Sequence, residues 1–125
     1  MPSNVWHISN RATGGSAATA TQAATGTSGN AQLRCRAIQA TLVGTSAATD
    51  RLVVRDGASG VGTIIFSADL SVAANGMAAL PPTPVDLRAS PGNALTVEFV
   101  NGAGTAEDVN AQGDIIPQGW PYNAD

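Results

Sequence analysis

The chain lacks lysine, and its six basic residues, all arginines, are outnumbered by nine acidic residues. The formal net charge is −3 at pH 7 and the sequence pI is about 4.8. Binding to nucleic acid through counterion release needs clustered positive charge. Two local arginine pairs, Arg34 with Arg36 and Arg51 with Arg55, fall in strand-like segments, where we expect them to form a solvated face. The composition therefore disfavours a nucleic-acid partner.

Cysteine and histidine occur once each, which excludes an intramolecular disulfide and a metal site of the His/Cys type. Cys35 lies in an apolar, strand-like run and is expected to be a small buried hydrophobe, and His7 has no predicted partner for acid–base catalysis. A calcium site in loops around Asp50, Asp56 or Asp108 stays open, although no loop has regularly spaced carboxylates. We therefore expect no catalytic residue, no cofactor and no metal site, and a protein that is not an enzyme.

Long apolar runs are also missing. No stretch approaches the ~20 residues that span a bilayer, so no membrane partner is expected. The first residues, MPSNVWH, have neither the basic region nor the apolar region of a signal peptide. We therefore expect synthesis in a cytoplasm.

Aromatic residues make up only 4% of the chain, and large apolar side chains are missing from the Ala/Thr/Ser/Gly tract between Ala12 and Gly29. Such a tract cannot offset the entropy of its own ordering by burial. Residues 1–30 are thus predicted to be an extended N-terminal arm, with Val5, Trp6 and Ile8 as partner-binding anchors. The alternative is that this short apolar segment folds back as an edge strand on its own domain.

A second group of aromatic residues follows the last predicted strand, in residues 117–125. This C-terminal tail holds Trp120 and Tyr122, and both residue types are favoured anchors at interfaces. The two side chains are predicted either to bind a partner or to fold over the open end of the domain.

What the chain does contain is a series of short apolar runs separated by turn signals. Asp56-Gly57 predicts a β-hairpin, Asn75-Gly76 predicts a second one, and Pro81–Pro84 predict an extended crossover outside any ladder. The best strand is Ala94 to Val100, whose apolar residues alternate with period two. Other predicted strands cover Leu33–Val43, Arg51–Arg55, Thr63–Ser67, Leu70–Val72, Met77–Leu80, Val85–Arg88 and Val109–Ile116.

Seven to eight short strands at regular spacing are typical of an all-β antiparallel β-sandwich, of jelly-roll or Ig-like type. The predicted sandwich domain covers residues 31–116. A partly closed barrel is the alternative. Neither a helical period nor a repeat of 20–50 residues is present.

Three short motifs carry a resemblance to a known class of proteins. The segments Leu52–Ser59, Ala73–Gly76 and Ala94–Val97 are similar to a hairpin, a turn and a late strand in small virion proteins of tailed bacteriophages. The resemblance covers about Leu33 to Ile116. It implies a β-sandwich on the outer surface of the phage head, a capsid decoration (cement) protein located in the virion. It also implies a homotrimer whose partner is the major capsid protein.

The leading hypothesis is therefore a decoration protein that stabilises the shell. Trimming residues 1–30 is then expected to abolish particle binding and to leave the sandwich folded. Two alternatives stay open. One is a phage neck, tail or fibre protein, and the other is a carbohydrate-binding β-sandwich module that uses Trp6, Trp120 and Tyr122.

Overall fold

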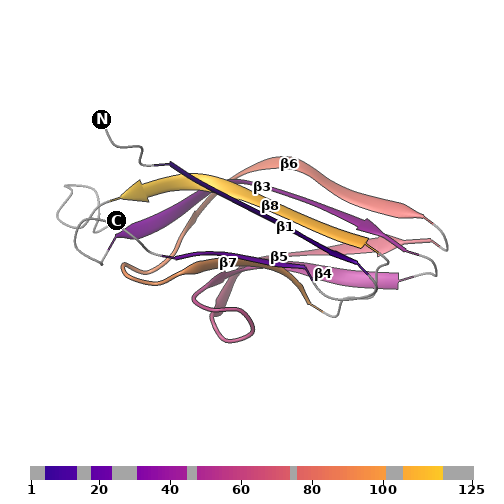
Figure 1. The fold of residues 1–125 in the computed structure, drawn as a ribbon, viewed down its shortest axis with the longest axis horizontal. Coiled ribbons are helices and arrows are strands. Elements are labelled where there is room, and N and C mark those ends of the chain that lie inside the picture. The colour runs from indigo at the N-terminus through magenta and orange to yellow at the C-terminus, as the bar shows by residue number, and fades with distance from the viewer. Residues whose placement is uncertain are drawn as a thin grey trace.

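The computed structural model describes residues 5–13, 18–23, 31–44, 48–73, 76–100 and 106–116, which form eight strands and two antiparallel sheets (Figure 1). The strands are β1 (Val5–Thr13), β2 (Thr19–Gln22), β3 (Gln32–Val43), β4 (Ala48–Asp56), β5 (Thr63–Val72), β6 (Met77–Arg88), β7 (Leu95–Val100) and β8 (Ala106–Ile116). The predicted all-β antiparallel sandwich is confirmed.

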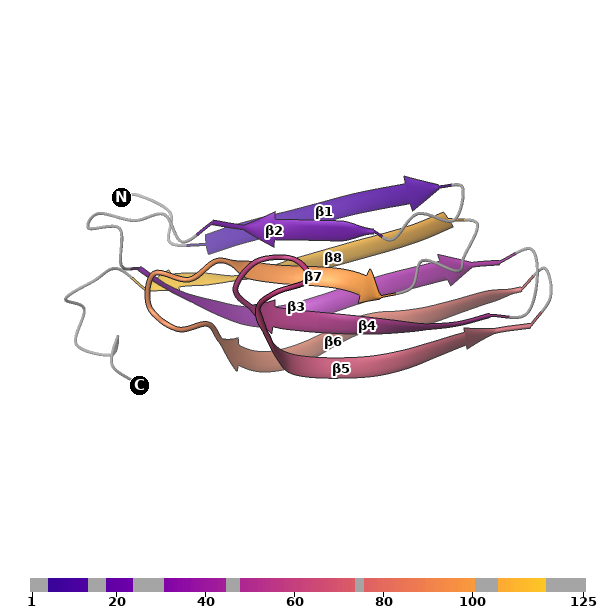
Figure 2. The ribbon, with the colours of Figure 1, turned by 90° about the horizontal axis from the view of Figure 1, so that it is seen from below.

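The strand order identifies the sandwich as a jelly roll. Sheet A has the order β1-β8-β3-β6 and sheet B has the order β2-β7-β4-β5. The first strand pairs with the last, the second with the seventh, the third with the sixth and the fourth with the fifth, in alternating sheets. Figure 2 shows that β1 lies beside β2 at one side of the sandwich and β6 beside β5 at the other. We call these sides the β1/β2 edge and the β5/β6 edge.

The space between the sheets is filled mainly by aliphatic side chains, together with Trp6 and Phe99. Phe99 and Leu95 from β7 are buried together with Leu33, Ile38 and Leu42 from β3. Cys35 also belongs to this core, as predicted, and burial raises the pKa of its thiol to about 11. It is therefore a structural, uncharged side chain at neutral pH.

The described part of residues 1–30 belongs to the sandwich, so the prediction of an arm outside it is wrong there. Strand β1 pairs with β8 along its whole length, and β2 pairs with β7. Ala18 and Ala20 are buried in the core, because a small side chain fits where an edge strand closes over the other sheet. Backbone hydrogen bonds to β8 and β7 stabilise these two strands, although their side chains bury little apolar area. The edge-strand alternative for Val5–Ile8 is confirmed.

Two predicted connections also differ from the structure. The Asp56-Gly57 hairpin is confirmed: it joins β4 to β5, and Gly57 has a φ of 126°. The second hairpin is wrong, since β5 lies in sheet B and β6 in sheet A.

The proline-rich segment is part of a strand instead of a crossover. Strand β6 includes Pro81, Pro82 and Pro84, and it pairs with β3 through two register shifts. Proline lacks an N–H donor, which an edge strand tolerates because one of its sides has no neighbouring strand.

Candidate functional site

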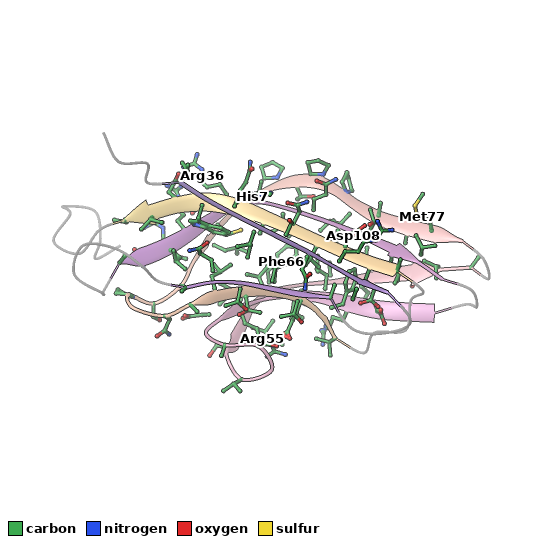
Figure 3. All side chains as sticks on the ribbon, in the orientation of Figure 1. His7, Arg36, Arg55, Phe66, Met77 and Asp108 are labelled. Carbon is green, nitrogen blue, oxygen red and sulfur yellow. The ribbon has the colours of Figure 1, made fainter. Side chains whose placement is uncertain are left out.

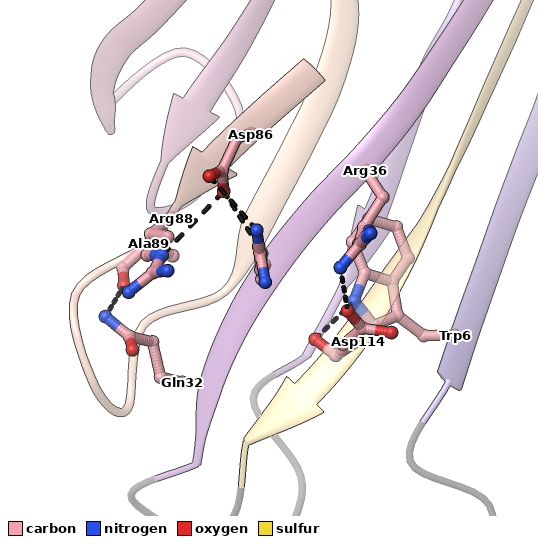
Figure 4. A network of polar contacts seen from close by, with 8 residues as sticks. Trp6, Gln32, Arg36, Asp86, Arg88, Ala89 and Asp114 are labelled. Carbon is pink, nitrogen blue, oxygen red and sulfur yellow. Dashed lines mark hydrogen bonds and ion pairs between the residues drawn. The ribbon is translucent and has the colours of Figure 1, made fainter. Parts of the chain in front are cut away.

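The three predicted anchors near the N-terminus have different environments. Trp6 is 5% exposed and packs in the core, where its indole Nε1 donates a hydrogen bond to the backbone oxygen of Asp114 at 3.0 Å (Figure 4). Ile8 is half-buried against the same core, whereas Val5 is 65% exposed at the start of β1. Trp6 is therefore no partner-binding anchor, and of the three only Val5 presents most of its surface.

The other predicted anchors, Trp120 and Tyr122, lie outside the described residues. With Trp6 buried, the sequence-based carbohydrate hypothesis loses one of its three aromatic side chains.

The loops expected around the acidic residues are also different. Asp50 is buried within β4, and Asp108 lies within β8. Asp56 ends β4 and accepts hydrogen bonds from Ser90 and from Asn93. Burial opposes ionisation of Asp56, but these bonds outweigh it and hold the pKa below its usual value. In the part of the chain that the structure describes, no group of three His, Cys, Asp or Glu side chains is placed to hold a metal.

The outer face of sheet A carries a regular array of polar side chains, which we call the polar face. Every second residue of β8 contributes to it: Asp108, Asn110, Gln112 and Asp114. The strand register places partners from β1 and β3 on both sides of each. The resulting rows are Arg11–Asp108–Thr41, Ser9–Asn110–Gln39, His7–Gln112–Ala37 and Val5–Asp114–Arg34.

The charged groups of the polar face are paired at its two ends. At one end Arg11 lies 3.6 Å from Asp108, and Thr41 donates a hydrogen bond to the same carboxylate at 3.2 Å. At the other end Arg36 contacts Asp114 at 3.2 Å (Figure 4).

Beside this second end, on β3 and the edge strand β6, Arg34 binds Asp86 through two hydrogen bonds of 2.8 and 3.1 Å. These hydrogen bonds from Arg34 lower the pKa of Asp86. The paired charges leave a neutral centre between the two ends.

That neutral centre is made of amides and one imidazole. His7 Nε2 lies 2.5 Å from Asn110 Oδ1, and since an amide oxygen only accepts, Nε2 carries the hydrogen. An open hollow of about 330 Å³ lies over the first and second rows, and another of about 250 Å³ lies over the second and third. Both are lined by Gln39 and Asn110, so the two hollows adjoin.

The outer face of sheet B is covered by the chain itself. The β4–β5 loop, residues 57–62, folds back over it, on the far side of the sandwich from His7 (Figure 3). Glu98 on β7 accepts hydrogen bonds from Arg55 at 3.2 Å, from the Ser59 hydroxyl at 2.9 Å and from the Gly60 N–H at 3.1 Å. Thr96 donates to the Gly57 oxygen at 2.9 Å. This face is therefore closed at its centre.

The third surface of interest is the β5/β6 edge, where large apolar side chains are exposed. Met77 on β6 is 70% exposed, and Val43, its partner on β3, is 38% exposed. Ile64 on β5 is 44% exposed, and Val61 in the loop before β5 is 85% exposed. Of the five large apolar side chains that the described residues expose, Ile64 and Met77 lie on the two strands of this edge, near the start of β5 and at the start of β6. Val43 lies on the inner strand β3, Val61 lies in the loop over sheet B, and Val5 lies on the β1/β2 edge.

Sequence reasoning missed the amides of the polar face. The signal was present in the alternation of polar and small or apolar residues from Asp108 to Asp114, which predicts a strand with one polar face. The sequence does not show that this strand lies in the middle of a sheet, between β1 and β3, and only that position gathers the four rows.

No helix of the described chain is long and apolar enough to cross a membrane. A scan against protein-family models finds no match, and no curated protein sequence matches either.

Several solved structures have a similar fold at low sequence identity. The atomic structure of Broad bean stain virus is 14% identical over 91% of this chain and 87% of the viral chain, with a TM-score of 0.47. The Yersinia pseudotuberculosis-derived mitogen is 12% identical over 98% of this chain and 94% of its own, with a TM-score of 0.43. A carbohydrate-binding module (CBM4) is 12% identical over 82% of this chain, with a TM-score of 0.35. This chain spans 61% of that module's length. At these identities the likeness is one of fold.

Proposed function

We propose that this chain is a structural protein of a tailed-bacteriophage particle, without catalytic activity. It decorates the outer surface of the head, binds the major capsid protein and stabilises the shell, as a homotrimer. The resemblance of residues 33–116 to small phage virion proteins supports this assignment, and the observation that carries it is the apolar β5/β6 edge.

The β5/β6 edge has the features of a docking surface. Burying an exposed isoleucine or methionine contributes about 1.5–3 kcal/mol, and Ile64 and Met77 lie on the two strands of this edge. The prolines of β6 have no backbone N–H group, so this strand offers fewer donors for pairing with a further strand. A partner therefore packs against side chains of β6, while β5 keeps its open backbone for strand pairing.

Stabilisation of a shell follows from this placement. A packaged genome pushes outward and strains the contacts between shell subunits. A bound trimer adds buried area across those contacts, and specific interfaces bury ~1,600 Å² in total. Many symmetric copies multiply a modest individual affinity.

The first experiment measures the copy number of this chain in purified particles, relative to the main shell protein. Hundreds of copies per particle are expected. A dozen or fewer would assign the chain to the neck, tail or fibre, and absence of the chain from the particle would refute a virion role.

The second experiment tests the edge itself. In Ile64→Ser and Met77→Ser, binding to particles that lack the protein should weaken by roughly tenfold to hundredfold each, because an apolar contact is lost. Val5→Ser is the matched control, since Val5 is exposed on the opposite edge. Full occupancy by the double variant, with an unchanged circular dichroism spectrum, would show that the edge is not the docking surface. Trp120→Ala and Tyr122→Ala in the same assay test the predicted anchors of the tail.

A further inference from the structure

We infer that the polar face of sheet A carries a binding site for a neutral glycan, centred on the hollow over Ala37. The inference is independent of the decoration role, because it concerns the outer face of the sandwich and not the β5/β6 edge. It rests on three features: the shape of the hollow, the chemistry of its walls and the neutrality of its centre.

The hollow exists because a small residue occupies the third row. Ala37 on β3 lies opposite Gln112 on β8, and its methyl group leaves a depression of about 250 Å³. The longer side chains of Gln39 and Gln112 line it, and Pro82 of β6 lines it as well. The adjoining hollow of about 330 Å³ continues along β8 toward Asp108. Together the two hollows form an elongated site that suits a short chain of sugar units.

The walls of the hollow offer donors and acceptors in pairs. A side-chain amide has two donor hydrogens and a carbonyl acceptor, and neighbouring sugar hydroxyls also both donate and accept. Gln39, Asn110 and Gln112 supply three such amides within two adjacent rows. The bond from His7 occupies the Asn110 oxygen and fixes the orientation of this amide. Its Nδ2 group is then set to donate to a ligand.

The apolar elements of the hollow fit the other side of a sugar ring. The methyl group of Ala37 and the ring of Pro82 present carbon surface. A pyranose ring is amphipathic, with C–H groups on its faces and hydroxyls around its rim. Contact of a ring face with this carbon surface leaves the hydroxyls directed at the amides.

The charge pattern selects for a neutral ligand. The arginines and aspartates of the face are paired at its ends, as Arg11 with Asp108 and Arg36 with Asp114. An anionic sugar would gain no unpaired arginine in the centre, and a cationic ligand would gain no unpaired carboxylate there. A neutral hydroxyl-rich ligand needs neither. The outer face of sheet B offers no comparable site, because the β4–β5 loop covers it.

The test begins with the full chain on an array of oligosaccharides, followed by calorimetric titration with cellohexaose, laminarihexaose and mannohexaose. At least one neutral glycan is expected to bind. Gln39→Ala and Gln112→Ala should each weaken binding by about two- to tenfold, the effect of one lost neutral hydrogen bond. Ala37→Met fills the hollow without removing an amide and should abolish binding.

The matched control is Thr49→Ala with Ser71→Ala, which removes an exposed hydroxyl pair from sheet B and should leave binding unchanged. Thermal unfolding verifies that each variant is folded, and the two glutamine variants decide the question if Ala37→Met is not. The inference is overturned if no glycan binds, if only anionic glycans bind, or if binding survives in folded Ala37→Met or in both glutamine variants. Selective binding of a peptide to this face would also refute it. Particle occupancy by Ala37→Met is a separate readout and tests the decoration role alone.

Discussion

At the scale of the residue, Gly113 on β8 is a position where no side chain fits. It lies beside the point where the register of β3 against β8 shifts, between Cys35 and Ala37. A Cβ at this position would collide with the Arg34 carbonyl oxygen and would lie 2.9 Å from the Cys35 Cα atom. The two strands can therefore approach this closely only because position 113 has no side chain. The consequence concerns the polar face, because β8 and β3 supply its amides.

Gly113→Ala is expected to destabilise the protein by roughly 1–3 kcal/mol or more, since the strands must separate to admit the methyl group. Chemical denaturation measures the change. Gly60→Ala is the control: Gly60 has a φ of 73° but open space around it, so only backbone strain is added there. A smaller loss in Gly113→Ala than in Gly60→Ala would contradict the steric explanation.

At the scale of the element, β7 shows which features local periodicity predicts and which it does not. Period two predicted a strand from Ala94 to Val100 with Thr96 and Glu98 on its polar side, and β7 is found there. Both of these side chains are nevertheless buried. The cover is the β4–β5 loop, which comes from a part of the sequence about 40 residues away. Local periodicity carries no information about such a distant cover.

The same limit explains the two larger errors. The tract from Ala12 to Gly29 has no large apolar side chains. The strand β2 within it and the strand β1 that ends in it are held by ladders to β7 and β8, which are distant in the sequence. Prolines 81, 82 and 84 exclude a central strand, but the sequence does not show that β6 lies at an edge. In the candidate site, the alternation of polar residues along β8 can be read from the sequence. The sequence does not show that His7 and Gln39 lie beside β8, because that depends on the order of the strands in the sheet.

The loop over β7 gives a prediction of its own. Glu98→Ala should cost about 3–5 kcal/mol, because Arg55 is then left nearly buried without its carboxylate. Ser59→Ala removes the hydroxyl that is shared between the two Glu98 carboxylate oxygens and should cost about 1.5–3 kcal/mol. Urea unfolding gives both values, and hydrogen exchange of the Gly60 amide reports whether the loop has left the sheet. A protected Gly60 amide in a fully stable Glu98→Ala protein would argue against this role of the carboxylate.

At the scale of the whole molecule, the two edges of the sandwich have different tasks. The β1/β2 edge completes the fold: Trp6 enters the core there and Ala18 donates its N–H to the buried Glu107. The β5/β6 edge exposes apolar side chains and is the proposed docking surface. The polar face between them is the proposed glycan site. A single small sandwich thus has room for two independent contacts.

Removal of residues 1–30 tests whether the β1/β2 edge is needed to complete the fold. The sequence suggested that the sandwich would stay folded without them, but the deletion removes β1 and β2 and leaves β8 and β7 as unpaired edges. Loss of the tryptophan alone is worth about 3–5 kcal/mol, against a typical total stability of 5–15 kcal/mol. We expect no cooperative thermal unfolding for the truncated chain. Deletion of residues 1–4, which precede β1, is the control, and a sharp transition in the longer deletion would restore the idea of a dispensable arm.

The pairing of first strand with last has a consequence for the order of events during synthesis. The β4–β5 hairpin can close as soon as it leaves the ribosome, then β6 can join β3, β7 can join β2, and β8 joins β1 at the end. The hydrogen bond from Trp6 to the backbone oxygen of Asp114 can form only after Asp114, 108 positions later, has been synthesised. Each later pair closes a longer loop, and folds dominated by such distant pairings are slow to form. Within this domain, the first strand therefore completes its pairing last.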